Sequence, residues 1–206
     1  TKSSKTPFTK MLFISGFKAV VSYKSTMVFT FISGLVMGSF MLYLSASQQI
    51  FEQQYGLVDE FPYIFAGLAL AFGASTFLNG KLVMKYGMEK LIKISLVSYT
   101  VTSFAYILLF FGEPNPSLTF LIVFLLAQFT SLGFLFGNLK AISLQPLGRI
   151  AGIGAAITGF ISALVAVPIG TFLGTFMQET TMPLFVGFFV CGLTSLIVYR
   201  YYKRIG

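Results

Sequence analysis

The stretch IAGIGAAITGFISALVAVPIGTFLGTFMQ, residues 150–178, decides the fold class of this protein. It runs for 29 positions without a charged residue. A helix needs about 20 such residues to cross a membrane, because it rises ~1.5 Å per residue through ~30 Å of hydrocarbon. Residues 150–178 are therefore predicted to form a membrane-spanning helix.

Small residues recur along this stretch in steps of three and four, which places them on one face of a helix. They are Ala155, Gly159, Ala163, Ala166, Gly170 and Gly174. A smooth face of this kind lets a second helix approach closely in lipid, where hydrophobicity alone does not hold helices together. We therefore expect the helix to have a closely packed helical partner.

The whole chain has the composition of a membrane protein. Of its 206 residues, 56% are hydrophobic and 10% are charged, and the mean hydropathy is +0.85. A soluble domain carries about 25% charged residues. The net charge of +8 would suggest a nucleic-acid partner in a soluble protein. Here we expect no nucleic acid, because the basic residues flank the apolar stretches.

The hydropathy pattern predicts an all-α membrane protein with six transmembrane helices. Residues 26–200 form the membrane domain, with helices expected at about 26–51, 61–80, 92–112, 116–139, 150–177 and 181–200. Residues 1–25 are interpreted as a cytoplasmic linker, either solvated or with an amphipathic helix on the membrane surface. Residues 201–206 form a cytoplasmic tail.

The charges predict how the helices are oriented. All 14 Lys and Arg residues lie before the first helix, between the second and third, between the fourth and fifth, or after the sixth. These segments share one side of the membrane, and Glu89 is the only one of the six acidic residues there. The positive-inside rule therefore places both termini in the cytoplasm.

The residue inventory argues against an enzyme. The chain has no histidine, and its single cysteine, Cys191, lies in an apolar run. No metal site, cofactor or internal disulfide is expected from this set. The uncharged cores of the six spans leave no Ser–His or paired-Asp machinery and no proton relay within this chain alone. We therefore expect no catalytic residue.

Polar and aromatic side chains on the first and fourth helices are candidates for lining a substrate cavity. They are Phe40, Tyr43, Ser47, Gln48 and Gln128. Aromatic and amide groups suit an apolar or cationic ligand. The alternative is ordinary packing, with Gln128 in an interhelical hydrogen bond. Other amides lie near expected helix ends, where solvation would explain them: Gln49, Asn79, Asn138 and Gln145.

Three stretches carry a family resemblance. GKLVMKYG, from Gly80, resembles the cytoplasmic loop signature Gly-x-Leu-x-Asp-Arg-x-Gly of the major facilitator superfamily, with matches at Gly80, Leu82, Lys85 and Gly87 and with Met84 in place of the Asp. YLSASQQIFEQQYGL, from Tyr43, and LQPLGRIAGIGAAITGFISALVAVPIG, from Leu144, are similar to the seventh and eleventh helices of bicyclomycin-resistance-type (Bcr/CflA) drug exporters. Lys140 departs from the small or polar residue that the resemblance suggests.

The resemblance implies that this chain is the carboxyl-terminal six-helix half of a twelve-helix exporter, built from 3+3 inverted repeats. It implies drug/proton antiport by alternating access across a bacterial inner membrane, with the proton-coupling carboxylate in the amino-terminal half. The implied partners are the lipid bilayer, that other half, protons and a small apolar or cationic drug-like substrate. The first and fourth helices would line the cavity, and the small-residue face of the fifth would contact the other half.

Two further interpretations remain open from the sequence. The six helices could form a self-contained channel or carrier that works as a homodimer, which transport by the purified chain would favour. They could also form a membrane subunit that transports nothing, which one stoichiometric partner without ligand binding would favour. If the resemblance holds, we expect the natural gene to encode six more helices upstream of Thr1.

Overall fold

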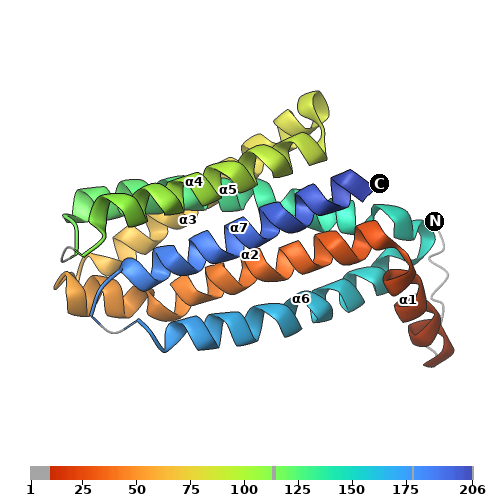
Figure 1. Ribbon diagram of the computed structural model, residues 1–206, viewed down its shortest axis with the longest axis horizontal. Coiled ribbons are helices and arrows are strands. Elements are labelled where there is room, and N and C mark those ends of the chain that lie inside the picture. Colours follow the sequence, from red (N-terminus) through yellow and green to blue (C-terminus); the bar gives the residue numbers. More distant parts are fainter. Residues whose placement is uncertain (1–9, 113–114, 178, 206) are drawn as a thin grey trace.

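The computed structural model describes residues 10–112, 115–177 and 179–205, and this part of the chain is helical except for short connections. The helices are α1 (Lys10–Ser22), α2 (Lys24–Gln48), α3 (Phe61–Tyr86), α4 (Met88–Phe110), α5 (Leu118–Leu144), α6 (Ala151–Gly174) and α7 (Met182–Ile205) (Figure 1). A π-helical segment, Gln49–Gln54, extends α2, and a 3₁₀-helical segment, Gln145–Ile150, joins α5 to α6.

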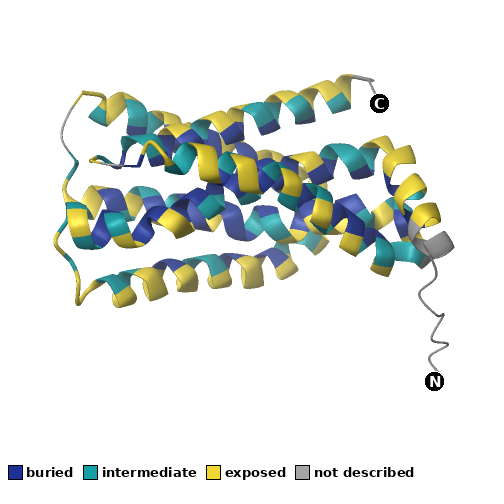
Figure 2. Cartoon of the chain, turned by 90° about the horizontal axis from the view of Figure 1, so that it is seen from below, coloured by how far each residue is buried: buried dark blue, intermediate teal, exposed yellow. Residues whose placement is uncertain are grey.

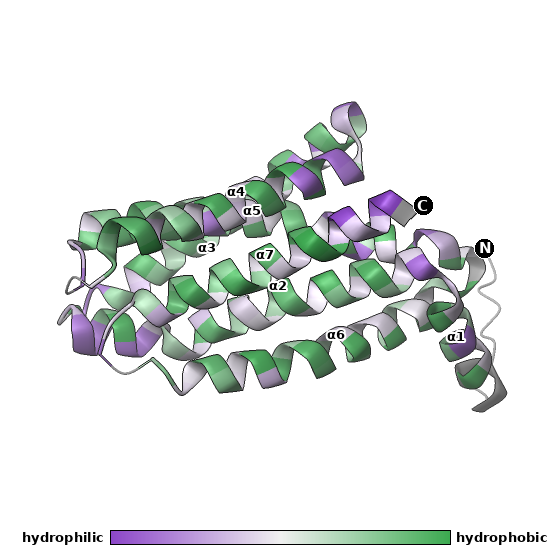
Figure 3. Ribbon diagram, in the orientation of Figure 1, coloured by the Kyte–Doolittle hydropathy of each residue, from purple (hydrophilic) through white to green (hydrophobic). Residues whose placement is uncertain are grey.

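Helices α2 to α7 are long and apolar enough to cross a membrane. With the extensions of α2 and α5, they offer candidate spans of 23 to 31 residues. Apolar residues cover their middle parts, while hydrophilic residues gather toward the ends of the bundle (Figure 3). The predicted all-α fold with six membrane-spanning helices is therefore confirmed, and the chain is a multi-pass membrane protein.

The packing of the six helices follows a three-helix repeat. Helix α2 packs against α6, α7 and α5, while α5 packs against α3, α4 and α2, and α4 packs against α7. If α2, α3 and α4 are exchanged with α5, α6 and α7, respectively, the same set of helix contacts results. Successive helices run in opposite directions, so the two repeats are inverted relative to one another (Figure 1).

Glycines make the closest approaches at two contacts that this exchange relates. A Cβ atom on Gly38 of α2 would lie 3.0 Å from the carbonyl oxygen of Ala166 on α6. A Cβ atom on Gly133 of α5 would lie 2.6 Å from the carbonyl oxygen of Phe72 on α3. Both helix pairs therefore pack backbone to backbone, which is how small residues bring membrane helices together.

Helix α1 lies across the end of the bundle at which α2 begins and α7 ends (Figure 1). Val20 is buried beside Leu147 and Ile157, whereas Ile14 and Phe17 are exposed. An exposed apolar face suits a helix on a membrane surface, so that location stays a prediction. Residues 1–9 of the expected linker and Gly206 of the expected tail lie outside the described residues.

Burial is uneven among the helices, with buried positions gathered on the inner sides of the bundle (Figure 2). Helix α3 is the least buried of the candidate spans. Its outer side carries Tyr63, Leu70, Phe77 and Met84, each more than 70% exposed. A helix so poorly covered within its own chain meets lipid or another protein over most of its length.

Candidate functional site: an aromatic cluster and its surroundings

Six aromatic rings meet where α2, α3 and α5 come together, and we call them the aromatic cluster. They are Phe40, Tyr43, Phe65, Phe72, Phe129 and Phe136. The ring centroid of Phe40 lies 5.8 Å from that of Phe129 and 5.6 Å from that of Phe136. These separations are typical of aromatic pairs in edge contact. The cluster therefore joins the two helices expected to line a cavity.

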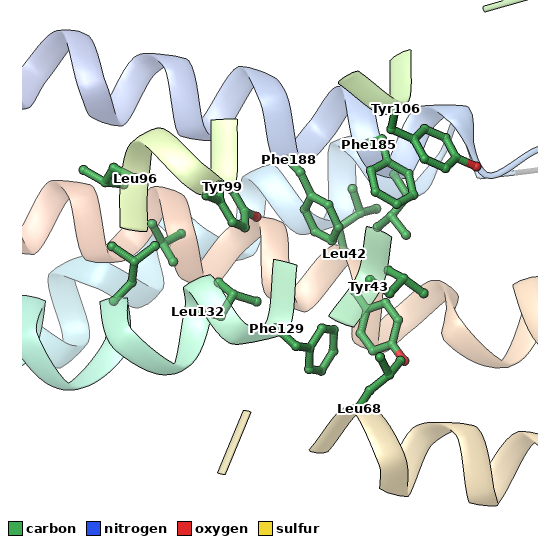
Figure 4. Packing of buried hydrophobic residues seen from close by; sticks show 14 of the residues in the cluster. Leu42, Tyr43, Leu68, Leu96, Tyr99, Tyr106, Phe129, Leu132, Phe185 and Phe188 are labelled. Carbon is green, nitrogen blue, oxygen red and sulfur yellow. The ribbon is translucent and has the colours of Figure 1, made fainter. Parts of the chain in front are cut away.

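One side of the aromatic cluster reaches the surface of the six-helix bundle. Phe40, Phe72 and Phe136 are half-buried, while Tyr43 and Phe129 are buried. The Tyr43 ring lies beside Phe129, with its hydroxyl pointing toward Leu68 (Figure 4). The half-buried rings offer a flat apolar surface of the kind that binds aromatic or cationic ligands.

The predicted cavity residues divide between this surface and the interior. Phe40 is half-buried and Gln48 is exposed, whereas Tyr43, Ser47 and Gln128 are buried. The amide nitrogen of Gln48 donates to Glu52 Oε2 at 3.1 Å on the extension of α2. A ligand on the surface of the chain could contact Phe40 and Gln48, whereas the other three positions are at most 2% exposed.

Gln128 belongs to a buried polar network. Its Nε2 donates to the carbonyl oxygen of Tyr99 at 3.2 Å and to Ser103 Oγ at 2.6 Å, and the Tyr99 hydroxyl lies 2.7 Å from Ser39 Oγ. The network thus links α2, α4 and α5 through the amide that we expected either to pack or to face a ligand. Gln128 Oε1 and the Tyr43 hydroxyl find no partner among the described residues. The ligand-facing role of Gln128 stays a prediction.

Lys140 lies inside α5, which continues to Leu144, five residues beyond the expected end at 139. Its Nζ donates to the carbonyl oxygen of Ala155 at 3.0 Å and to Thr158 Oγ1 at 3.3 Å, both on α6. The α-helix therefore runs past the predicted end of the span and includes Lys140. Lysine is a good helix former, so it does not end α5, and oxygens on α6 bond its ammonium group.

The small-residue face of α6 is only partly available to another protein. Ala166 is fully buried, and a Cβ atom on Gly170 would lie 3.3 Å from Met41 Cβ on α2. These two residues therefore pack against α2 of the same chain, which corrects the expectation that the whole face contacts another half. The other four members are half-buried: Ala155, Gly159, Ala163 and Gly174.

The face of α2 that packs against α6 also consists of small residues, which was not predicted from the sequence. Thr26, Thr30, Gly34 and Gly38 follow one another in steps of four, and all are buried. The hydroxyl of Ser162 on α6 donates to the carbonyl oxygen of Thr30 at 3.0 Å. The spacing of these small residues was a readable signal, because a smooth face on α2 is what a smooth face on α6 requires.

Asn79 and Asn138 form a reciprocal pair between α3 and α5. Asn138 Nδ2 donates to Asn79 Oδ1 at 2.7 Å, and Asn79 Nδ2 donates to Asn138 Oδ1 at 3.3 Å. Both side chains are buried. The expectation that solvation explains them was wrong, because each amide completes the hydrogen bonding of the other inside the bundle.

The signature expected to form a loop is mostly helical. Gly80, Leu82 and Lys85 lie in the last turns of α3, which ends at Tyr86. Gly87 alone separates α3 from α4, with φ of 79° and ψ of 154°. Only glycine adopts this conformation readily. The second glycine of the signature therefore makes the turn, and the basic residue sits on the helix before it.

The described residues hold no group of three or more His, Cys, Asp or Glu side chains that could bind a metal ion.

Comparison with known proteins gives a similarity over nearly the whole chain. No family model matches, and no solved structure matches. The chain is 20% identical over 216 residues to a bicyclomycin resistance protein homolog of Haemophilus influenzae, and the alignment covers 97% of this chain and 50% of that relative. The chain thus spans about half the length of the curated relative that it matches. Over nearly its whole length, the chain is therefore similar to half of a protein named for drug resistance.

Proposed function

We propose that this chain is the carboxyl-terminal six-helix half of a drug exporter of the major facilitator type. The observation that carries the proposal is the alignment, which takes in 97% of this chain but only 50% of a bicyclomycin resistance protein homolog. The chain itself packs as two inverted three-helix repeats. Two such halves around a midplane site form a transporter of this superfamily.

The aromatic cluster is the proposed wall of the substrate site. Phe40, Phe72 and Phe136 supply half-buried rings from three helices, and Gln48 supplies an exposed amide toward one end of α2. Apolar stacking and cation–π contact favour a small apolar or cationic drug. The amino-terminal half supplies the opposite wall, and the two halves rock about the site to alternate access.

Proton coupling is assigned to the other half. Among the described residues, Glu52 lies on the extension of α2 and Glu89 lies at the start of α4, bonded to Lys203. Neither carboxylate lies in the middle of a span, where proton-coupled transporters hold their ionisable groups. We therefore place the proton-coupling carboxylate in the other half. The proposed activity of the whole exporter is drug/proton antiport across a bacterial inner membrane, with both termini of this chain in the cytoplasm.

The test is drug resistance in a bacterium that lacks its own efflux pumps. The natural gene, or this chain expressed together with a companion six-helix half, should reduce susceptibility to bicyclomycin, and a protonophore should abolish the effect. The 206-residue chain alone should confer no resistance. Transport by the purified chain alone in liposomes would instead support a homodimeric carrier. A stoichiometric partner without drug binding or resistance would support a subunit that does not transport.

A further inference from the structure

Lys140 places a positive charge inside a candidate membrane span. It lies in α5, within the apolar span Leu118–Gly148, and four residues follow it before the α-helix ends. Its Nζ is bonded to oxygens of Ala155 and Thr158, which lie near the start of α6. The ammonium thus bonds into the neighbouring helix instead of extending past the end of its own.

Among the described residues, these bonds leave the charge without a counter-ion. Both acceptors are neutral, and an ammonium group has three N–H donors. The only ion pair among the described residues joins Lys203 to Glu89. Glu52, Asp59, Glu60 and Glu179 belong to segments at the opposite end of the bundle (Figure 1). The Lys140 side chain is exposed on the surface of this chain, so its remaining N–H donor is open to a group from outside.

The surroundings of Lys140 leave room for another helix. Gly137 and Ala141, which lie beside it on α5, are exposed, while Ala155 and Gly159 on α6 are half-buried. A Cβ atom on Gly159 would lie 3.8 Å from Lys140 Nζ. Small residues around a polar group are typical of a contact between membrane helices, whereas a lipid-facing surface is usually covered by large apolar side chains.

The aromatic cluster lies directly beside this place. Phe136 precedes Lys140 by four residues, so the two side chains lie on the same side of α5, one turn apart. The ammonium therefore marks the end of the proposed substrate wall that is nearer the end of α7. This is where the two halves of an exporter must meet to close that end of the cavity.

We propose that Lys140 is a carboxylate-binding residue whose partner is an Asp or Glu side chain on a membrane helix of the companion half. The ion pair joins the two halves at the end of the aromatic cluster that is nearer the end of α7. The inference rests on the proposed function, because it requires a companion half, and it adds the residue and the chemistry that hold the two together.

The experiment expresses this chain with a tagged companion half and measures co-purification of the two after extraction into detergent. Lys140→Glu should abolish co-purification, Lys140→Met should weaken it, and Lys140→Arg should preserve it. Lys93→Glu is the matched control, because Lys93 is exposed on α4 and carries the same change of charge. It should leave co-purification unchanged.

A charge exchange identifies the partner. Each membrane Asp or Glu of the companion half is changed to Lys, and one of these changes should restore co-purification with Lys140→Glu. Cysteines at that position and at Lys140 should then form a disulfide in a Cys191→Ser background, since Cys191 is the only cysteine of this chain. Failure of every companion change to rescue Lys140→Glu would overturn the proposal.

Other outcomes separate this inference from the proposed function. Co-purification of Lys140→Glu at the wild-type level would overturn the ion pair and leave the half-exporter intact. If Lys140→Glu assembled normally but exported no drug, the partner of the ammonium group would be a carboxylate of the substrate. If native mass spectrometry showed an anionic lipid bound through Lys140, the partner would be a lipid phosphate. Either result would overturn the ion pair with the companion half. Failure of the wild-type chain to join any companion half would overturn the proposed function itself.

Discussion

Gly87 holds the turn between α3 and α4 in a backbone conformation that side chains disfavour, with φ of 79° and ψ of 154°. Gly87→Ala should lower the free energy of unfolding by about 1–3 kcal/mol, because a Cβ atom strains this region of backbone space. Thermal unfolding of the purified chain in detergent measures the effect.

Gly80 is the matched control, because it belongs to the same signature but lies within α3, where an added Cβ atom would meet nothing within 4 Å. Gly80→Ala should leave stability unchanged or raise it by up to about 1 kcal/mol, because Ala favours the helix. Equal losses for the two variants would contradict the role assigned to the Gly87 turn.

A substitution of Gln128 distinguishes a structural role in hydrogen bonding from a role in ligand binding. Gln128→Leu removes the hydrogen bonds to Tyr99 and Ser103 at nearly constant volume. Hydrogen bonds between membrane helices contribute about 0.6 kcal/mol on average and about 1.7 at most, so a loss of stability in this range is expected. Calorimetry in detergent measures it, with Gln48→Leu as an exposed control. Unchanged stability together with altered drug specificity of the full exporter would favour the ligand-facing role.

Among whole elements, the contact between α2 and α6 depends most on small residues. A Cβ atom on Gly38 would lie 3.0 Å from both the Ala166 carbonyl oxygen and Ile169 Cβ. Gly38→Leu should therefore separate the two helices and destabilise the chain by about 1–3 kcal/mol, the usual cost of overpacking. Size-exclusion chromatography after stepwise heating reports the loss of folded protein.

The three-helix repeat extends this prediction to a second contact. Gly133→Leu on α5 should destabilise the chain in the same way, because it meets the backbone of α3 at Phe72. Gly67→Leu on α3 should not, because nothing lies within 4 Å of a Cβ atom there. If all three variants unfolded alike, close packing would not distinguish these contacts.

The six long helices could be predicted from the sequence, whereas the helix that each one packs against could not. The small-residue face of α6 was readable from spacing, but spacing names a face and not the helix that covers it, so Ala166 and Gly170 proved to contact α2. The sequence predicts the end of the fourth span at residue 139, because hydropathy does not register the oxygens that α6 supplies to the Lys140 ammonium group. Asn79 and Asn138 needed the packing of α3 on α5 before their pairing could be seen.

At the scale of the whole molecule, the six helices leave two flanking helices only partly covered. Helix α3 packs on α5 and helix α6 packs on α2, and the repeat relates the two. Both carry small residues on an open side. On α6 these are Ala155, Gly159 and Ala163, and on α3 they are Ala66, Ala69, Gly73 and Gly80.

The open side of α3 divides into a large-residue surface and a small-residue surface. Tyr63, Leu70 and Phe77 recur in steps of seven and cover one surface. Ala66, Ala69, Gly73 and Gly80 lie on the other surface, between these residues and the side on which Phe65 and Phe72 join the aromatic cluster. We assign the large residues to lipid and the small ones to the companion half, because helices in lipid meet through small residues.

Gly73→Leu separates this assignment from internal packing. A Cβ atom on Gly73 meets nothing within 4 Å, and the same holds for Gly67 at the opposite edge of the open side. Neither Leu variant should change the stability of the isolated chain. Gly73→Leu should nevertheless reduce co-purification with the companion half and drug resistance together, because its side chain occupies the space of the opposing helix. Gly67→Leu should retain both, since lipid accommodates an added side chain. Retention of both by Gly73→Leu would place the small-residue surface of α3 in lipid and leave α6 as the flanking helix that meets the other half.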